Sequence, residues 1–160
     1  MTQSSEKTTV WLTNAAFTRL TQELEELEGP AWAEIVERIS SARDEGDLKE
    51  NGGYHAAKDE QGKMKGRIDQ LKELLRDVTT ETAADDGIVS PGKVVSYRFE
   101  GDDEVETFLL ANREVEGDEG LTYEVYSAAA PLGSALLGAQ KGTTASFEAP
   151  NGKTLQVEVV

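Results

Sequence analysis

Residues 42–61, "ARDEGDLKENGGYHAAKDEQ", carry nine acidic or basic side chains and two adjacent glycines between two runs of helix-forming sequence. On both sides of this stretch apolar residues recur at spacings of three and four, which is the pattern of one helix face. A charged interruption between two such runs predicts a helical hairpin whose arms pack as an antiparallel coiled coil. The turn, which forms the tip of that hairpin, is therefore expected at residues 44–51.

The two arms are defined by their apolar stripes. The first arm begins near Asn14, where Asn14 or Thr13 can act as the N-cap. It breaks at "EGP" (28–30), where Pro30 suits the first turn of a renewed helix. Its stripe is Phe17, Leu20, Leu24, Leu27, Trp32, Ile35, Val36, Ile39 and Ala42. The stripe of the second arm is Tyr54, Ala57, Gln61, Met64, Ile68, Leu71, Leu75 and Val78. The steady alternation of three and four in the second stripe predicts one long, regular helix.

The tip itself has two interpretations. Gly46 fits the position just past the first arm, Asp47 fits the N-cap of the second arm and Glu50 fits its third position. A reciprocal helix cap therefore explains both carboxylates, and spacing alone favours this structural explanation. However, Asp44 and Glu45 add negative charge at the same exposed turn. Exposed carboxylates are hard-oxygen ligands, so such a tip would bind Mg²⁺ weakly alone and could complete a metal site in another protein.

Beyond residue 84 the apolar pattern changes to that of short strands. The segment "DDGIVSPG" (85–92) is expected to be a linker. Strands are expected at residues 94–99, 105–111 and 121–127. A short helix is expected over "PLGSALLG" (131–138), followed by a β-hairpin with an Asn151–Gly152 turn.

The predicted fold class is therefore α+β. Residues 1–84 form a coiled-coil hairpin, and residues 93–160 form a small antiparallel sheet domain with one short helix.

Composition excludes several kinds of site. The chain has 160 residues, no cysteine and one histidine, His55, so disulfides, thiolate nucleophiles and a multi-histidine metal site are excluded within one chain. The net charge of −15, from 31 acidic and 16 basic residues, argues against autonomous sequence-specific DNA binding because phosphates would be repelled. Neither a signal peptide nor an apolar window of membrane-spanning length is evident, so a soluble cytoplasmic protein is expected.

The stretch "ARDEGDLKENGGYHAAKDEQGKMKGRI" (42–68) resembles the hairpin tip of the Gre family of bacterial transcript cleavage and elongation factors, most closely its GreA branch. A segment close to "AR-x-x-GDLKENAEYHAA" is the hallmark of that family. The later "SPG" and "PLGSALLG" segments also fall where the family has them, so the resemblance covers nearly the whole chain. This chain departs from the pattern at Gly52–Gly53, where the family usually has Ala-Glu.

The resemblance implies a function in transcription. A Gre factor binds bacterial RNA polymerase, inserts its coiled coil through the secondary channel and stimulates the polymerase to hydrolyse backtracked RNA. By resemblance, Asp47 would help hold an Mg²⁺ ion shared with the polymerase, and Glu50 would position or activate the attacking water. The chain would thus be no free-standing enzyme, because it donates carboxylates to the active centre of its partner.

The resemblance also implies contacts with RNA and polymerase. Arg43 and Lys58 match basic positions that contact the extruded 3′ end of the nascent RNA. The second domain resembles the FKBP-like domain that docks on the polymerase, through a patch that would include Ala130, Pro131, Leu132 and Ser134. A monomer is expected.

Two other functions remain open from the sequence. A Gre-like inhibitor would use the same fold to block the polymerase channel, and the extra acids at the tip are compatible with it. A coiled-coil adaptor or chaperone would take no part in RNA chemistry, and there Asp47 and Glu50 would only cap a helix.

Overall fold

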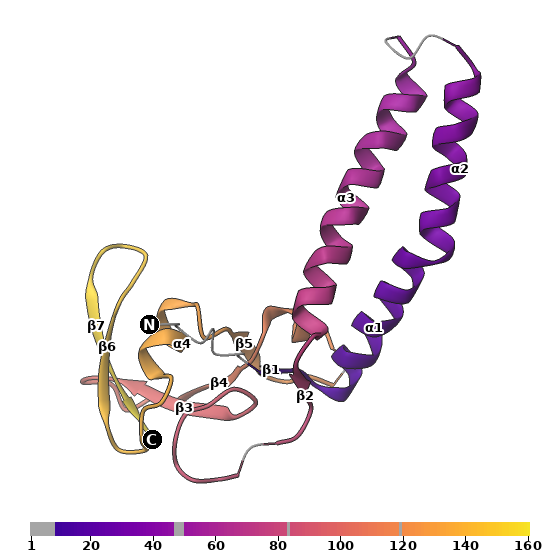
Figure 1. The fold of residues 1–160 in the computed structure, drawn as a ribbon. Helices are drawn as coiled ribbons and strands as arrows, with labels where there is room; N and C mark the ends of the chain where they lie inside the picture. The colour runs from indigo at the N-terminus through magenta and orange to yellow at the C-terminus, as the bar shows by residue number, and fades with distance from the viewer. Residues whose placement is uncertain (1–8, 47–49, 83, 119) are drawn as a thin grey trace, which may run out of the picture. The chain divides into compact units, whose positions relative to one another are not determined.

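The computed structural model describes residues 9–46, 50–82, 84–118 and 120–160, which form two compact units (Figure 1). The helical unit is Phe17–Asp77, and the sheet unit comprises the described residues on either side of it. This division differs from the boundary expected at residue 84. The reason is that β1 (Val10–Trp11) pairs in parallel with β2 (Val78–Thr79), so the chain on both sides of the helices joins the sheet unit.

The helices follow the predicted arms closely. They are α1 (Asn14–Glu28), α2 (Pro30–Asp44) and α3 (Gly52–Leu75). The break between α1 and α2 confirms the predicted interruption, and Pro30 occupies the first turn of α2, where its missing N–H needs no partner. The second arm ends earlier than expected, because Val78 belongs to β2 rather than to the end of α3.

The predicted apolar stripes pack α2 against α3. Ile35, Ile39 and Ala57 form a buried cluster. Trp32, Tyr54 and Met64 pack against that cluster. Val36 departs from the expected stripe and is 46% exposed, because it follows Ile35 directly and so lies about 100° further round the helix.

A charged contact joins α1 to α3. The Arg67 guanidinium donates to both carboxylate oxygens of Glu23, at 2.7 and 3.0 Å. This hydrogen-bonded contact holds the pKa of Glu23 below its ordinary value. Because the depressed pKa belongs to the folded state, the contact stabilises the fold above about pH 4.5 and the contribution is lost as pH falls below that value.

Glu23→Gln should therefore flatten the pH dependence of the unfolding free energy below about pH 4.5. The carboxamide cannot ionise, so the variant has no Arg67-bound carboxylate to protonate. Urea unfolding from pH 3 to pH 7 measures the effect, followed by Trp32 fluorescence in a Trp11→Phe background that leaves Trp32 as the only tryptophan. Glu26→Gln, at an exposed position of the same helix, is the control. Equal slopes in the two variants would contradict the assignment.

The second unit contains a five-stranded sheet in the order β5-β4-β3-β7-β6. Its strands are β3 (Val94–Phe99), β4 (Glu106–Leu110), β5 (Glu124–Tyr126), β6 (Thr144–Glu148) and β7 (Thr154–Val159). The predicted all-antiparallel sheet is corrected to a mixed one, because β4 and β5 pair in parallel. The connection between them includes a 3₁₀ turn at Arg113–Val115 and is long enough to carry the chain back to the same end of the sheet.

The core of the sheet unit forms between the sheet and α4 (Pro131–Leu136). Leu132 and Leu136 pack in one cluster with side chains from the strands, among them Phe108 and Val157. Residues 85–92, expected as a linker, are bonded into this unit: the Val89 N–H donates to the Ala139 carbonyl at 2.9 Å.

The predicted hairpin near the C-terminus is present, with a different turn. The Gly152 N–H donates to the Ala149 carbonyl at 2.9 Å, so Pro150 and Asn151 are the central residues. Gly152 follows them with a φ of 81°, a left-handed conformation that favours glycine. The connection is therefore longer than the expected two-residue Asn151–Gly152 turn.

Across the described ranges, no helix is both long and apolar enough to cross a membrane.

Candidate functional site at the end of the helical hairpin

The end of α2 forms one side of the tip. The Glu45 N–H donates to the Ala42 carbonyl at 3.2 Å, which closes the last turn. Gly46 follows with a φ of 135°, a conformation that side chains disfavour. The predicted helix end at Gly46 is thus confirmed.

The start of α3 differs from the prediction. Its N-cap is Asn51, whose side-chain oxygen accepts the Tyr54 N–H at 3.0 Å. Tyr54, rather than Glu50, therefore occupies the third helical position, and Glu50 lies just before the cap. The predicted cap residue, Asp47, lies outside the described residues.

Sequence reasoning missed Asn51 because a second, equally good pattern stood four residues earlier. Asn ranks with Asp as an N-cap, and a Gly pair after it is a weak start for a helix. The Asp-x-x-Glu pattern favoured the earlier position. No local rule decides between two caps that both fit.

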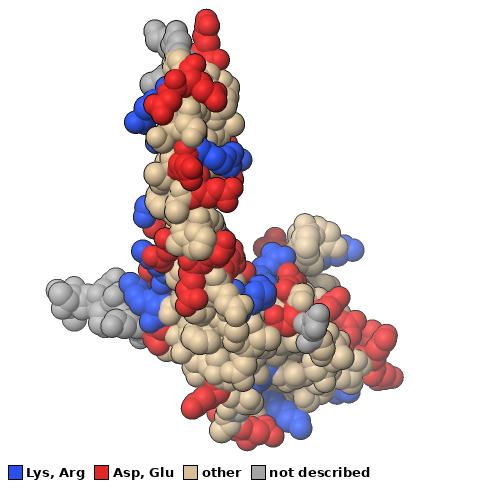
Figure 2. Space-filling view, turned by 90° about the vertical axis from the view of Figure 1, so that its right-hand side faces the viewer, with Lys and Arg blue, Asp and Glu red and all other residues tan. Residues whose placement is uncertain are grey.

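Exposed carboxylates gather at the tip. Asp44, Glu45 and Glu50 are all exposed, and Figure 2 shows acidic side chains at this end of the hairpin as well as along its length. Glu50 makes no hydrogen bond or ion pair with any other described residue. Within the described ranges, no three or more His, Cys, Asp or Glu side chains are grouped to hold a metal ion. The described part of the tip thus offers carboxylates without enclosing a metal site of its own.

Basic and aromatic side chains flank these acids. The Arg43 guanidinium lies over the Tyr54 ring, 5.8 Å from its centroid, and the His55 ring meets the Tyr54 ring edge-on at 5.5 Å. Lys58 lies one turn along α3 from Tyr54 and donates to the Gln61 side-chain oxygen at 3.3 Å. Both predicted RNA contacts, Arg43 and Lys58, are exposed. Arg43 is held at the tip, whereas Lys58 stands on the body of α3.

The predicted docking residues lie at the start of α4, in the sheet unit. Ala130 is the N-cap, and its carbonyl accepts the Ser134 N–H at 2.7 Å. Leu132 is only 9% exposed and belongs to the core, so its side chain has little surface to offer a partner. Pro131 and Ser134 are exposed and line a shallow pocket between α4 and β6.

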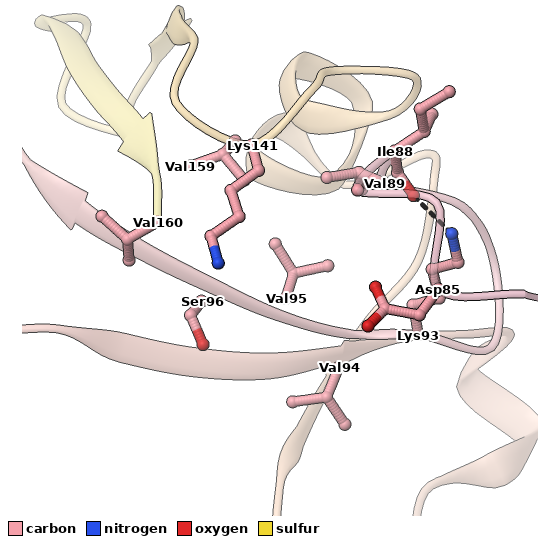
Figure 3. A pocket seen from close by; sticks show the side chains of 11 residues that line it. Asp85, Ile88, Val89, Lys93, Val94, Val95, Ser96, Lys141, Val159 and Val160 are labelled. Atoms are coloured by element: carbon pink, nitrogen blue, oxygen red, sulfur yellow. Dashed lines mark hydrogen bonds between the residues drawn. The ribbon is translucent and has the colours of Figure 1, made fainter.

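Another pocket of the sheet unit lies beside β3 (Figure 3). Its lining combines five valines with polar residues, and the Lys141 side chain points into it. Lys93, at its edge, donates to the Ile88 carbonyl at 2.7 Å. In the described residues no buried side-chain nitrogen or oxygen lacks a hydrogen-bond partner. None of the buried polar atoms around this pocket therefore requires a ligand.

Comparison with known proteins gives matches over both units. Residues 10–79 match the family model described as "Transcription elongation factor, N-terminal", and residues 84–160 match "Transcription elongation factor, GreA/GreB, C-term". The transcription elongation factor GreA of Streptomyces coelicolor is 51% identical over 162 residues, covering 100% of this chain and 96% of that protein. The GreA of Saccharopolyspora erythraea is 52% identical over 161 residues, covering 98% and 95%.

A solved structure also matches along the chain. The GreA factor homolog 1 (Gfh1) of Thermus thermophilus is 27% identical, with a TM-score of 0.43, over 96% of this chain and 97% of that one. Because this TM-score is low, the assignment of the chain rests on the sequence matches.

Proposed function

Because the chain belongs to the GreA/GreB family of transcription elongation factors, we propose that it rescues backtracked RNA polymerase by stimulating transcript cleavage. The family assignment makes it a transcription elongation factor that acts on RNA polymerase. Beyond that, we propose that the hairpin enters the secondary channel of the enzyme and brings its tip to the extruded RNA 3′ end. The sheet unit docks on the polymerase, with Pro131 and Ser134 as exposed contacts and Ala130 as the cap that orients them.

The observation that carries this proposal is the exposed Glu50 carboxylate, which precedes the α3 cap and has no partner among the described residues. A carboxylate used only for capping would bond to a helix N–H, whereas Asn51 supplies that bond here. An acid at the end of a long hairpin that no other described residue binds is suited to a site in another molecule. We infer the same use for Asp47 from the family resemblance.

The reaction proposed is hydrolysis of a phosphodiester bond in the active centre of the polymerase. Mg²⁺ bound there supplies charge neutralisation and activates water. Asp47 is the residue of this chain that would help hold that ion, and a hard carboxylate oxygen fits it. Glu50 orients the attacking water and accepts its proton. The water oxygen bonds to phosphorus, the P–O3′ bond breaks, and the retained RNA gains a free 3′ hydroxyl while the released fragment keeps the phosphate.

The chain is therefore proposed as a stimulating factor and not as an enzyme by itself. Its described residues hold no complete metal-ligand group. Arg43 and Lys58 supply the local positive charge that an acidic protein needs close to RNA phosphates. Tyr54 places the Arg43 guanidinium at the tip, where such a contact would be made.

The test uses purified bacterial RNA polymerase stalled in a backtracked complex with 3′-labelled RNA. The protein is added with Mg²⁺, and release of short 3′ fragments is followed against the rate without the protein. Rapid release that saturates with protein concentration is the expected result. Slowed nucleotide addition without release would instead identify a channel-blocking inhibitor, which the added acids Asp44 and Glu45 would suit. No effect on either reaction would leave an adaptor role.

A further inference from the structure

One side chain bonds to both helices at the end of the hairpin. The Asn51 side-chain oxygen accepts the Tyr54 N–H of α3, and its side-chain nitrogen donates to the Ala42 carbonyl of α2. Because the oxygen is committed to the N–H donor, the amide orientation is fixed and the NH₂ group must face α2. Asn51 is half-buried, whereas the described residues on both sides of it, Glu50 and Gly52, are exposed.

Asn51 bonds to backbone groups at the ends of both helices. The first N–H groups of α3, among them that of Tyr54, have no partner within the helix, and the Ala42 carbonyl near the end of α2 accepts the Asn51 NH₂ group in addition to the Glu45 N–H. The start of α3 is also weak in itself, because Gly52 and Gly53 lose more backbone entropy on folding than other residues. The Cβ of a larger residue would meet no atom within 4 Å at Gly52, and only the Asn51 side chain, at 3.5 Å, at Gly53. Packing around the two glycines therefore does little to hold the start of α3, where the bonds of Asn51 act together with the packing of Tyr54.

We propose that Asn51 is a positioning residue, which fixes the last turn of α2 to the first turn of α3 and thereby sets where the tip presents Glu50. This inference rests on the function proposed above. Consecutive Cα atoms are about 3.8 Å apart, so a displacement of Asn51 is passed directly to Glu50. Asn51 acts through its neighbour and needs no contact with RNA or metal.

A second contact between α2 and α3, that of Arg43 with Tyr54, depends on the bond of Asn51 to Ala42. Arg43, in the last turn of α2, lies over the ring of Tyr54, the residue whose N–H Asn51 binds. Tyr54 in turn packs against the buried cluster that joins α2 and α3. Losing the bond from Asn51 to Ala42 would free the two turns to separate and would shift Arg43 relative to Glu50. Glu50, proposed to act on the attacking water, and Arg43, proposed to contact RNA, are therefore both positioned by the bonds of Asn51.

Three variants distinguish the effect of the bond to Ala42 from that of the bond to Tyr54. Asn51→Ser keeps a good N-cap for Tyr54 but has no NH₂ group for Ala42. Asn51→Ala loses both bonds. Asn51→Ser combined with Gly53→Ala strengthens the helix start without restoring the bond between the helices. Asn14→Ser, at an exposed asparagine at the start of α1, is the control.

The first measurement uses the free protein. Because the chain has no cysteine, spin labels can be attached to cysteines placed at the exposed positions Ser40 and Ala56. The distribution of distances between the labels should broaden in Asn51→Ser and stay unchanged in Asn14→Ser. An unchanged distribution in Asn51→Ser would overturn the inference whatever the cleavage assay gives.

The second measurement is the cleavage assay on backtracked polymerase. We expect Asn51→Ser to lower the maximal rate about tenfold to a hundredfold, since displacing a reacting group by about 1 Å has effects of that size. The protein concentration for half-maximal rate should not change, and Gly53→Ala should not restore the rate. Full recovery with Gly53→Ala would mean that only helix stability matters, which overturns the inference. If the unsubstituted protein gives no cleavage, the proposed function fails, and the label distances still decide whether Asn51 fixes the tip.

Discussion

Asp47→Asn should lower the maximal rate of stimulated transcript cleavage at least about a hundredfold, the size expected when a positioned acid–base or metal-binding group is lost. The asparagine has nearly the same shape, but its neutral oxygen is a much weaker ligand for Mg²⁺ than a carboxylate. Glu50→Gln should give a loss of similar size, because a carboxamide cannot accept the proton of the attacking water. The concentration for half-maximal rate should be unchanged in both variants, since docking is proposed to use the sheet unit.

The matched controls are Asp44→Asn and Glu45→Gln, which remove one charge each from exposed acids at the same tip. Their rates should stay within about twofold of the unsubstituted protein, because screened surface charges have weak effects. Equal losses in all four variants would show that only the total negative charge matters.

Since the cap of α3 is Asn51, thermal stability should not change in Asp47→Asn. A cleavage rate for Asp47→Asn equal to that of the controls would remove Asp47 from the mechanism.

Gly133→Ala should destabilise the sheet unit by about 3 kcal/mol, the upper part of the range for an overpacked core. Gly133 is buried in α4, and a Cβ built on it would lie 2.1 Å from the Ser127 carbonyl oxygen and 3.3 Å from a Leu110 methyl carbon. That carbonyl also accepts the Ala130 N–H at 3.1 Å, so it cannot turn away without loss of the turn that leads into α4. The helix must shift outward instead, which opens the core beneath Leu132 and Leu136.

The two tryptophans allow this change to be measured in one unit at a time. Trp11 belongs to the sheet unit and Trp32 to the helical unit, so a Trp32→Phe background leaves Trp11 as the only tryptophan. Urea unfolding followed by its fluorescence gives the free energy of the sheet unit. Ser134→Ala, at the exposed next position of α4, is the control and should change that free energy by less than about 0.5 kcal/mol. A difference below about 1 kcal/mol between Gly133→Ala and the control would contradict the prediction.

The elements with a clear apolar period could be predicted from the sequence. The alternating residues of Val94–Phe99 gave a strand with the observed bounds, and the stripe of α3 gave the residues that bury against α2. The two-residue strands β1 and β2 could not be found in this way, because two residues are too few to show a period. The parallel pairing of β4 with β5 also escaped prediction, since strand direction depends on the path of the connection and not on the strands themselves.

At the candidate site, the charged residues could be predicted from the sequence, whereas the contacts between the two helices could not. The acids at the tip and the basic Arg43 stand out in the sequence, and the roles of Asp47 and Glu50 in cleavage stay predictions drawn from the resemblance. The contact of Arg43 with Tyr54 and the bond of Asn51 to Ala42 join residues on different helices. Such contacts depend on how the two arms pack, so no pattern within either arm reveals them.

The parallel pairing of β1 with β2 makes the whole helical unit an insertion between two neighbouring strands. The chain leaves the sheet unit after Ala16, shortly beyond β1, and re-enters it at Val78, on the strand that pairs with β1. The length of the helical arms is therefore independent of the sheet unit, because adding or removing whole turns of α2 and α3 leaves both attachment points in place. The length of the helical arms can therefore change without a change in the strands and the core of the sheet unit.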